Sequence, residues 1–203
     1  MAMKTPKDYG LVSSNVEMDA AGSTEVDSPF DLKAEDFLSF AEEDVKGDKD
    51  KDIINALSNA KRAIENRMDH LLYAFGYPIL EEHWNFPEKI DMLNNLGIIA
   101  PRILRKINTI RNLLEHEYKL PNKAEVEDAI DVAILFLEST KKFIYQFVAD
   151  FTCYDKEHRL NLEFKDHREI KIWIISPEDE VFSITYKDST FCDWLRFLIE
   201  SAY

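Results

Sequence analysis

The stretch "KDIINALSNAKRAIENRMDHLLYAF", residues 51–75, repeats apolar residues at steps of three and four. The apolar positions are Ile53, Ile54, Leu57, Ala60, Ile64, Met68, Leu71, Leu72 and Phe75. This spacing gathers them on one side of a helix and predicts a long amphipathic α-helix. Gly76 and Pro78 follow directly and are typical of a helix end.

Four other segments carry helical patterns. Residues 31–46 form a short acidic one, and residues 87–97 form another that begins with proline and ends with glycine. Residues 101–120 follow between two prolines, and residues 122–151 form a long pattern that opens with an asparagine, a good helix cap. Long helices joined by short loops are typical of an antiparallel bundle.

The periodicity changes after residue 155. "RLNLEF" (159–164) and "VFSITY" (181–186) alternate apolar and polar residues, and "IKIWII" (170–175) is rich in β-formers. Polar turn segments separate the three. They predict a small antiparallel β-meander, followed by a last helix within residues 189–203.

These patterns predict a mainly α protein in three parts. Residues 31–152 would form an antiparallel helical bundle, and residues 153–203 a β-meander with a terminal helix attached to it. Residues 1–30 show no sustained period and are expected to be a flexible acidic arm. A chain of 203 residues is long enough for one main core.

Charge is distributed unevenly along the chain. The net charge is −14, which argues against a protein that coats nucleic acid without specificity. Residues 1–50 hold five Lys against thirteen Asp and Glu, a net of −8, whereas residues 101–119 hold five Lys and Arg against two Glu, a net of +3. The segment 101–119 is therefore a local basic island.

The sequence carries no pattern for a membrane span, a metal or a cofactor. No apolar run approaches the roughly 18 to 20 residues that a membrane helix needs, so we expect a cytoplasmic protein with no membrane contact. Cys153 and Cys192 lie far apart, and the spacing of His158 and His167 fits no compact ligand motif. We expect no metal and no cofactor.

The basic island ends in "IRNLLEHEYKL", residues 110–120, where titratable side chains stand among leucines. On a helix, Arg111 and His116 lie about 140° apart around the axis and cannot share one stripe. Asn112 and His116 are four residues apart and lie on one face, whereas Arg111 and Tyr118 are seven apart and nearly superimpose.

Arg111 falls on the apolar side of this helix, where an unpaired cation is costly. A simple account is available: Arg111 and Glu115 would form an intrahelical ion pair, and His116 would be stabilised by the helix dipole. Tyr118 would then be an aromatic residue at the helix edge. Otherwise a group from another chain or a bound anion must satisfy the guanidinium.

Taken as a unit, "RNLLEHEY" has the form R-N-x-x-x-H-x-Y and resembles the signature of the HEPN superfamily. It is most similar to the HEPN toxins that are paired with minimal nucleotidyltransferase antitoxins. The motif also stands where that family has it, near the end of one helix and before a short loop and a long helix. The resemblance covers about residues 50–150, so the acidic arm and the β-meander lie outside it.

The resemblance implies metal-independent RNA cleavage, in which the ribose 2′-hydroxyl attacks the adjacent phosphate. Such a reaction needs a group that titrates near neutrality and a fixed cation for the developing charge. His116 is the candidate acid and base, Arg111 the candidate phosphate ligand, and Asn112 a residue that orients either of them. The family commonly dimerises through this helix, so the resemblance also implies a homodimer with a composite cleft.

Four more residues are candidates around this motif. Arg102, Arg105 and Lys106 could extend a positive track for RNA, or they could simply form a solvated helix face. In the toxin branch the tyrosine that matches Tyr118 is a target for nucleotide transfer by the antitoxin, which implies the same regulatory modification here. A second function also remains open: a non-catalytic HEPN-like module that binds a nucleotide, RNA or protein partner.

Overall fold

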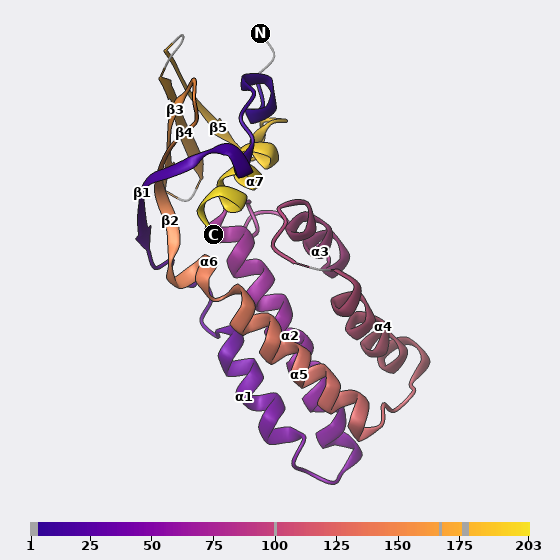
Figure 1. Cartoon of the computed structure of the whole chain (residues 1–203). Coiled ribbons are helices and arrows are strands. Elements are labelled where there is room, and N and C mark those ends of the chain that lie inside the picture. The colour runs from indigo at the N-terminus through magenta and orange to yellow at the C-terminus, as the bar shows by residue number, and fades with distance from the viewer. Residues whose placement is uncertain (1–3, 100, 167, 176–178) are drawn as a thin grey trace.

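The structure, a computed structural model, describes residues 4–99, 101–166, 168–175 and 179–203. In the helix that carries the R-N-x-x-x-H-x-Y motif it describes the whole backbone, but not the side chains of residues 103, 110, 111 and 113–117. The chain forms a helical part and, at one end of it, a β-sheet covered by the last helix (Figure 1).

The predicted helices are present. Their bounds are α1 (Ala34–Asp44), α2 (Asp50–Ala74), α3 (Phe86–Asn95), α4 (Pro101–Glu117), α5 (Lys123–Thr140) and the single-turn α6 (Lys142–Tyr145). Helix α2 is central and packs against α1, α3, α4 and α5. Of the nine apolar positions predicted for its inner face, all but the half-buried Ile54 are buried.

Local capping explains where two of these helices begin. At the start of α5, the Glu125 backbone N–H donates to Asn122 Oδ1 and the Asn122 N–H donates to Glu125 Oε2, both at 3.0 Å. Asn85 and Glu88 form the same reciprocal pair at the start of α3. Each pair satisfies backbone donors that a helix start leaves free, which fixes the start of each helix.

The sheet has five antiparallel strands in the order β1-β2-β3-β4-β5. Their bounds are β1 (Glu17–Thr24), β2 (Phe147–Tyr154), β3 (Arg159–Lys165), β4 (Glu169–Ile175) and β5 (Glu180–Thr185). The predicted meander is confirmed as β3 to β5, and the predicted last helix as α7 (Phe191–Ala202). Alternate residues of β3 and β4, such as Leu160 and Ile172, are buried on one face of the sheet.

The prediction of a mainly α protein is wrong. The chain is 51% helix and 19% strand, and its five-stranded sheet makes it a mixed α/β protein. The long helix expected over residues 122–151 ends at Thr140, and residues 147–154 form β2. Phe147 and Phe151 explain the error, because a spacing of four residues lies on one face of a helix and also on one face of a strand.

The bundle and the sheet share one apolar core. The ring of Phe147, in β2, lies 5.6 Å from that of Phe75 at the end of α2 and 5.0 Å from that of Phe164 in β3. The boundary expected between residues 152 and 153 thus falls inside β2. The sheet packs on the helices through this aromatic contact.

The first 30 residues, expected to be a flexible arm, contain the edge strand β1 and two short 3₁₀ helices, Pro6–Tyr9 and Ser13–Asn15. Strand β1 pairs with β2 from Glu17 opposite Tyr154 to Thr24 opposite Phe147, with two register shifts. All eight of its residues are exposed, so its sequence carries no amphipathic pattern. Its pairing depends on residues that lie about 130 positions later in the chain, which local periodicity cannot show.

Candidate functional site

Helix α4, which carries the motif, lies at the edge of the helical part, on the other side of α2 from α1 (Figure 1). Its buried residues Leu104 and Ile107 face α2 and α3, whereas Arg102, Arg105 and Lys106 are exposed. The three predicted cationic residues therefore share the solvent side of one helix. This placement agrees with both interpretations of these residues, a positive track for RNA and a solvated helix face.

One of these cations already has a partner. The Arg105 guanidinium forms an ion pair with Asp91 of α3, and both side chains are more than half exposed. An exposed ion pair contributes only about 0 to 1 kcal/mol, so it can open for a phosphate at little cost. Arg102 and Lys106 thus provide the more accessible positive charge of the basic island.

The motif occupies the last turns of α4. Asn112 is half-buried, and the helix ends at Glu117. The backbone places positions 111, 112 and 116 on this one helix, as predicted, but the side chains of Arg111 and His116 lie outside the described residues.

Tyr118 follows the helix with an unusual backbone and a free side chain. Its φ of 54° is left-handed, a conformation that tyrosine seldom adopts and that turns the chain out of α4. Its side chain is 89% exposed, the highest value among the large hydrophobic residues of the described part. Pro121 is buried beyond it, and Asn122 then caps α5. A helix, a short loop and a long helix therefore follow one another in this region.

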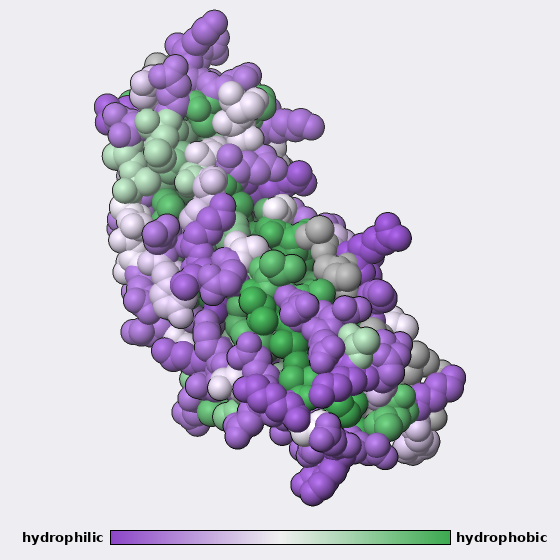
Figure 2. Space-filling model, turned by 60° about the horizontal axis from the view of Figure 1, so that its bottom comes forward, coloured by the Kyte–Doolittle hydropathy of each residue, from purple (hydrophilic) through white to green (hydrophobic). Residues whose placement is uncertain are grey.

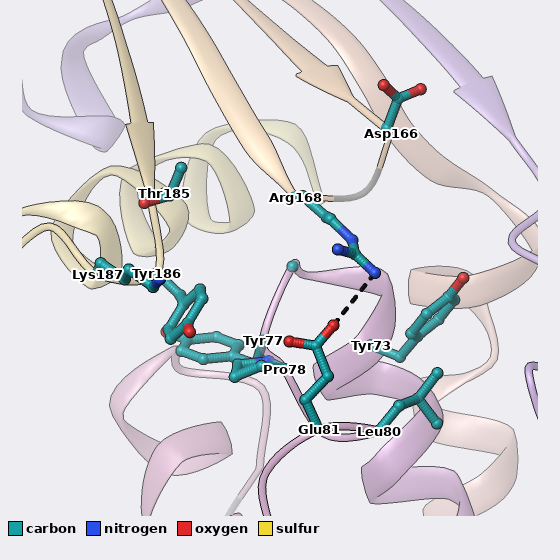
Figure 3. A pocket seen from close by; sticks show the side chains of 11 residues that line it. Tyr73, Tyr77, Pro78, Leu80, Glu81, Asp166, Arg168, Thr185, Tyr186 and Lys187 are labelled. Atoms are coloured by element: carbon teal, nitrogen blue, oxygen red, sulfur yellow. Dashed lines mark ion pairs between the residues drawn. The ribbon is translucent and has the colours of Figure 1, made fainter.

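The structure contains a second candidate site, which was not predicted from the sequence. A cavity of about 230 Å³ lies where the end of α2 and the following loop meet the β3–β4 turn and the end of β5. Figure 3 shows side chains from these segments around it, with Arg168 and Glu81 pointing toward each other. The residues that line the cavity include Tyr77, Glu81, Arg168, Tyr186 and Lys187. They come from segments far apart in the sequence, so no sequence motif identifies them.

The cavity has an aromatic side and a charged side. On the charged side, Arg168 Nη2 lies 3.4 Å from Glu81 Oε1, an ion pair that joins the sheet to the α2–α3 loop. On the other side, Tyr77 and Tyr186 line the cavity (Figure 3). Tyr77 is buried, and burial raises the pKa of its hydroxyl far above the ordinary value, so this tyrosine stays neutral.

A buried charge cluster lies between α2 and α3. Lys89 Nζ lies 3.1 Å from Glu65 Oε1 and 2.8 Å from Asp69 Oδ1, and the Lys89 side chain is almost completely buried. Burial alone would raise the pKa of Glu65, but Lys89 and then Lys61 outweigh it and lower that pKa. Burial does raise the pKa of Asp69. We assign this cluster to packing of α3 on α2, since its charges are paired with one another.

The histidines and cysteines outside α4 offer no metal centre in the described part of the chain. Among the residues that the structure describes, no group of three His, Cys, Asp or Glu side chains lies close enough together to hold a metal ion. His158 Nδ1 lies 3.3 Å from Asp155 Oδ1 within a turn, and His167 lies outside the described residues. Cys153 and Cys192 are free thiols.

No protein-family model matches the chain, and no curated protein and no solved structure gives a significant match. In the part of the chain that the structure describes, no helix is both long enough and apolar enough to cross a membrane.

Proposed function

We propose that this protein is a metal-independent endoribonuclease of the HEPN type, which cleaves RNA through attack of the ribose 2′-hydroxyl on the adjacent phosphate. The observation that carries the proposal is the pattern R-N-x-x-x-H-x-Y at the end of an outer helix, followed by a short loop and a capped long helix. The helix, loop and long helix around the motif are the arrangement that the resemblance implies. A chance match of the same residues could lie in any structural setting.

Each residue of the motif has a role in this reaction. His116 takes the proton of the 2′-hydroxyl and returns one to the leaving oxygen, because imidazole titrates near neutral pH. Arg111 stabilises the charge that develops on the phosphate, for which a guanidinium offers several fixed donors. Asn112 is half-buried and is proposed as the positioning residue for His116, which lies four residues later on the same face of the helix.

The site is proposed to be complete only in a homodimer. Arg111 and His116 lie about 140° apart around the helix, so a two-fold axis beside α4 is needed to bring both kinds of side chain into one cleft. Figure 2 shows an apolar band across the helical part, bordered by hydrophilic side chains. Separately, Leu120 in the α4–α5 loop and Leu135 in α5 are 48% and 68% exposed, and exposed apolar surface supports self-association.

Tyr118 is the proposed control point of the enzyme. A nucleotidyltransferase antitoxin would transfer a nucleotide from a nucleoside triphosphate to its hydroxyl, which is exposed on the loop after α4: the hydroxyl oxygen attacks the α-phosphate, its proton is lost to solvent, and pyrophosphate leaves. The added phosphate would place negative charge beside the RNA-binding cations and repel the substrate. This regulation belongs to a toxin–antitoxin or defence role, and we place the protein and its RNA substrate in the cytoplasm as part of the same proposal.

A non-catalytic binding module is the second candidate function. The cavity between the helical part and the sheet favours it, because the HEPN resemblance does not extend to the β3–β4 turn or β5, which form much of its wall. In that case the chain would bind RNA, a nucleotide or a protein partner, and the motif on α4 would serve dimerisation alone.

The experiment that separates the two functions is RNA cleavage in the presence of EDTA. Wild type and the variants Arg111→Ala, His116→Ala and His158→Ala are incubated with total cellular RNA. We expect wild type and His158→Ala, which changes a turn histidine, to cut equally. The other two should be at least about 100-fold slower. Equal cutting by His116→Ala would exclude the proposed mechanism, and RNA binding without cutting by any variant would favour the module.

A further inference from the structure

We propose that the cavity between the end of α2 and the sheet is a binding site for a guanine base, carried by a mononucleotide or by single-stranded RNA. Among the described residues that line the cavity, none lies on α4. The site is therefore separate from the proposed ribonuclease motif, and the two proposals stand independently.

The size of the cavity limits the ligand. Its volume of about 230 Å³ is below the roughly 300 to 1,000 Å³ of pockets that hold drug-sized molecules. A single purine base with its ribose fits such a space, whereas a dinucleotide does not. The cavity opens to solvent, so the remainder of a nucleotide or of an RNA strand can extend out of it.

The aromatic side of the cavity supplies a surface for stacking. Tyr186, which is half-buried, lines this side and offers its ring to a base, whereas Tyr77 is only 6% exposed and forms part of the wall (Figure 3). Tyr77 is fixed by its neighbours, because its ring packs at 5.6 Å against both Trp84 and Phe191. A planar base that stacks on a preformed aromatic surface loses little binding energy to reorganisation of the protein.

The charged side selects guanine among the bases. Arg168 only donates hydrogen bonds and the Glu81 carboxylate only accepts them. Guanine matches this pair, since its O6 and N7 accept while its N1–H and amino group donate. Cytosine, adenine and uracil each offer Glu81 a single donor group and match less well.

The ion pair between these residues can give way to a ligand. Arg168 and Glu81 are 74% and 62% exposed, and at 3.4 Å their contact is loose. Such an exposed pair adds little stability, so exchanging it for two hydrogen-bonded contacts with a base edge is favourable. Lys187, whose Nζ lies 5.6 Å from the ring centre of Tyr186, stands at the rim and is positioned for the phosphate.

Isothermal titration calorimetry of the full chain with GMP, CMP, AMP and UMP tests the proposal. We expect GMP to bind with a dissociation constant on the order of 10 µM, and CMP, AMP and UMP to bind at least about tenfold more weakly than GMP. Binding of AMP or UMP as tight as that of GMP would overturn the proposal, as would absence of GMP binding up to about 1 mM.

Two variants locate the binding site. Glu81→Gln and Arg168→Gln should each weaken GMP binding at least about tenfold, since each removes one of the two base-reading contacts. Arg159→Gln is the matched control, because Arg159 is also an exposed arginine in an ion pair, with Asp19 on the sheet at 3.1 Å. All three positions are exposed, so the variants should fold. GMP affinity that is unchanged in both cavity variants would contradict the site.

A second titration distinguishes the two sources of the base. The ligands are GMP and a trinucleotide with guanine between two uridines. If the site serves single-stranded RNA, the trinucleotide binds at least as tightly as GMP. If it serves a free nucleotide, the flanking residues clash with the rim and weaken binding at least about tenfold. Either result supports a guanine site, whereas failure of both ligands to bind removes it without affecting the proposed ribonuclease.

Discussion

The Nε2 atom of His70, in α2, lies 2.9 Å from the carbonyl oxygen of Val26. Because a carbonyl oxygen only accepts, Nε2 carries the hydrogen in this bond. The backbone N–H of Val26 in turn donates to the carbonyl oxygen of Ile144 at 3.0 Å. Val26 therefore fastens the end of the N-terminal segment to both the central helix and α6, although the segment before it is acidic and mostly exposed.

This attachment predicts a loss of stability at low pH. Burial lowers the pKa of His70 from its ordinary value near 6.5, with the nearby Arg67 as a smaller cause, while the bond to Val26 opposes the shift. Between that lowered pKa and 6.5 the unfolded chain binds more protons than the folded one, so stability falls as the pH decreases from about 6.5. Thermal unfolding of wild type and His70→Gln between pH 7.5 and 5.5 should show the steeper decline in wild type. Parallel declines in the two proteins would contradict this role of His70. The control is His158→Asn, which changes a histidine in a turn of the sheet.

A docked N-terminal segment also predicts unequal effects of two substitutions. Val26 is 2% exposed and Met18 is 56% exposed. Val26→Asp would bury an unpaired charge and should reduce the free energy of unfolding by about 3 kcal/mol, whereas Met18→Asp should change it by less than about 1 kcal/mol. Denaturant titration measures both. Near-equal, small effects would mean that the first 30 residues are a flexible arm after all.

Removal of Lys89 should be more damaging than removal of an exposed lysine. Lys89→Met removes the buried cation that bridges the half-buried carboxyl groups of Glu65 and Asp69 and leaves only Lys61 near Glu65, a change that costs about 3 kcal/mol. Lys141→Met is the matched control, because Lys141 is exposed and its ion pair with Glu138 spans 3.7 Å. If chemical denaturation gives the same free energy for both variants, the cluster does not hold α3 on α2.

The lowered pKa of Glu65 adds a dependence on pH to this prediction. A carboxyl group with a lowered folded-state pKa stabilises the fold above its unfolded value near 4.5, and this contribution is lost as the pH falls through the folded value. The raised pKa of Asp69 acts in the opposite direction. In Lys89→Met the larger of the two cationic effects on the Glu65 pKa is absent and only Lys61 remains, so the stability of the variant should fall less steeply than that of wild type below about pH 4.5.

Local periodicity predicted most of the individual elements and failed on long-range pairing. The inner face of α2, the start of α5 at Asn122 and strands β3 to β5 follow from patterns within a few residues of each element. Strand β1 has no such pattern, because its sequence EMDAAGST is exposed throughout and has few β-forming residues. Strand β1 forms through pairing with β2. Because most of β2 was predicted to be helix, no partner strand for β1 was expected.

The candidate sites divide in the same way. The motif on α4 is contiguous, so the sequence could show it, and the structure adds the exposed, left-handed Tyr118 and the solvent side of Arg102 and Lys106. The cavity needs Glu81 and Arg168, which are 87 positions apart in the chain and meet only because the sheet packs on the end of α2. A single sequence contains no pattern that predicts this contact.

The most direct test of the proposed ribonuclease uses one short RNA in two forms. Wild type is incubated in EDTA with an RNA that contains one mapped cleavage site, and with the same RNA carrying a 2′-deoxyribose at that site. We predict cleavage of the first to a 2′,3′-cyclic phosphate end and no cleavage of the second, because the 2′-hydroxyl is the nucleophile. Cleavage of both forms, or fragments with a 3′-hydroxyl end, would contradict the mechanism assigned to Arg111 and His116.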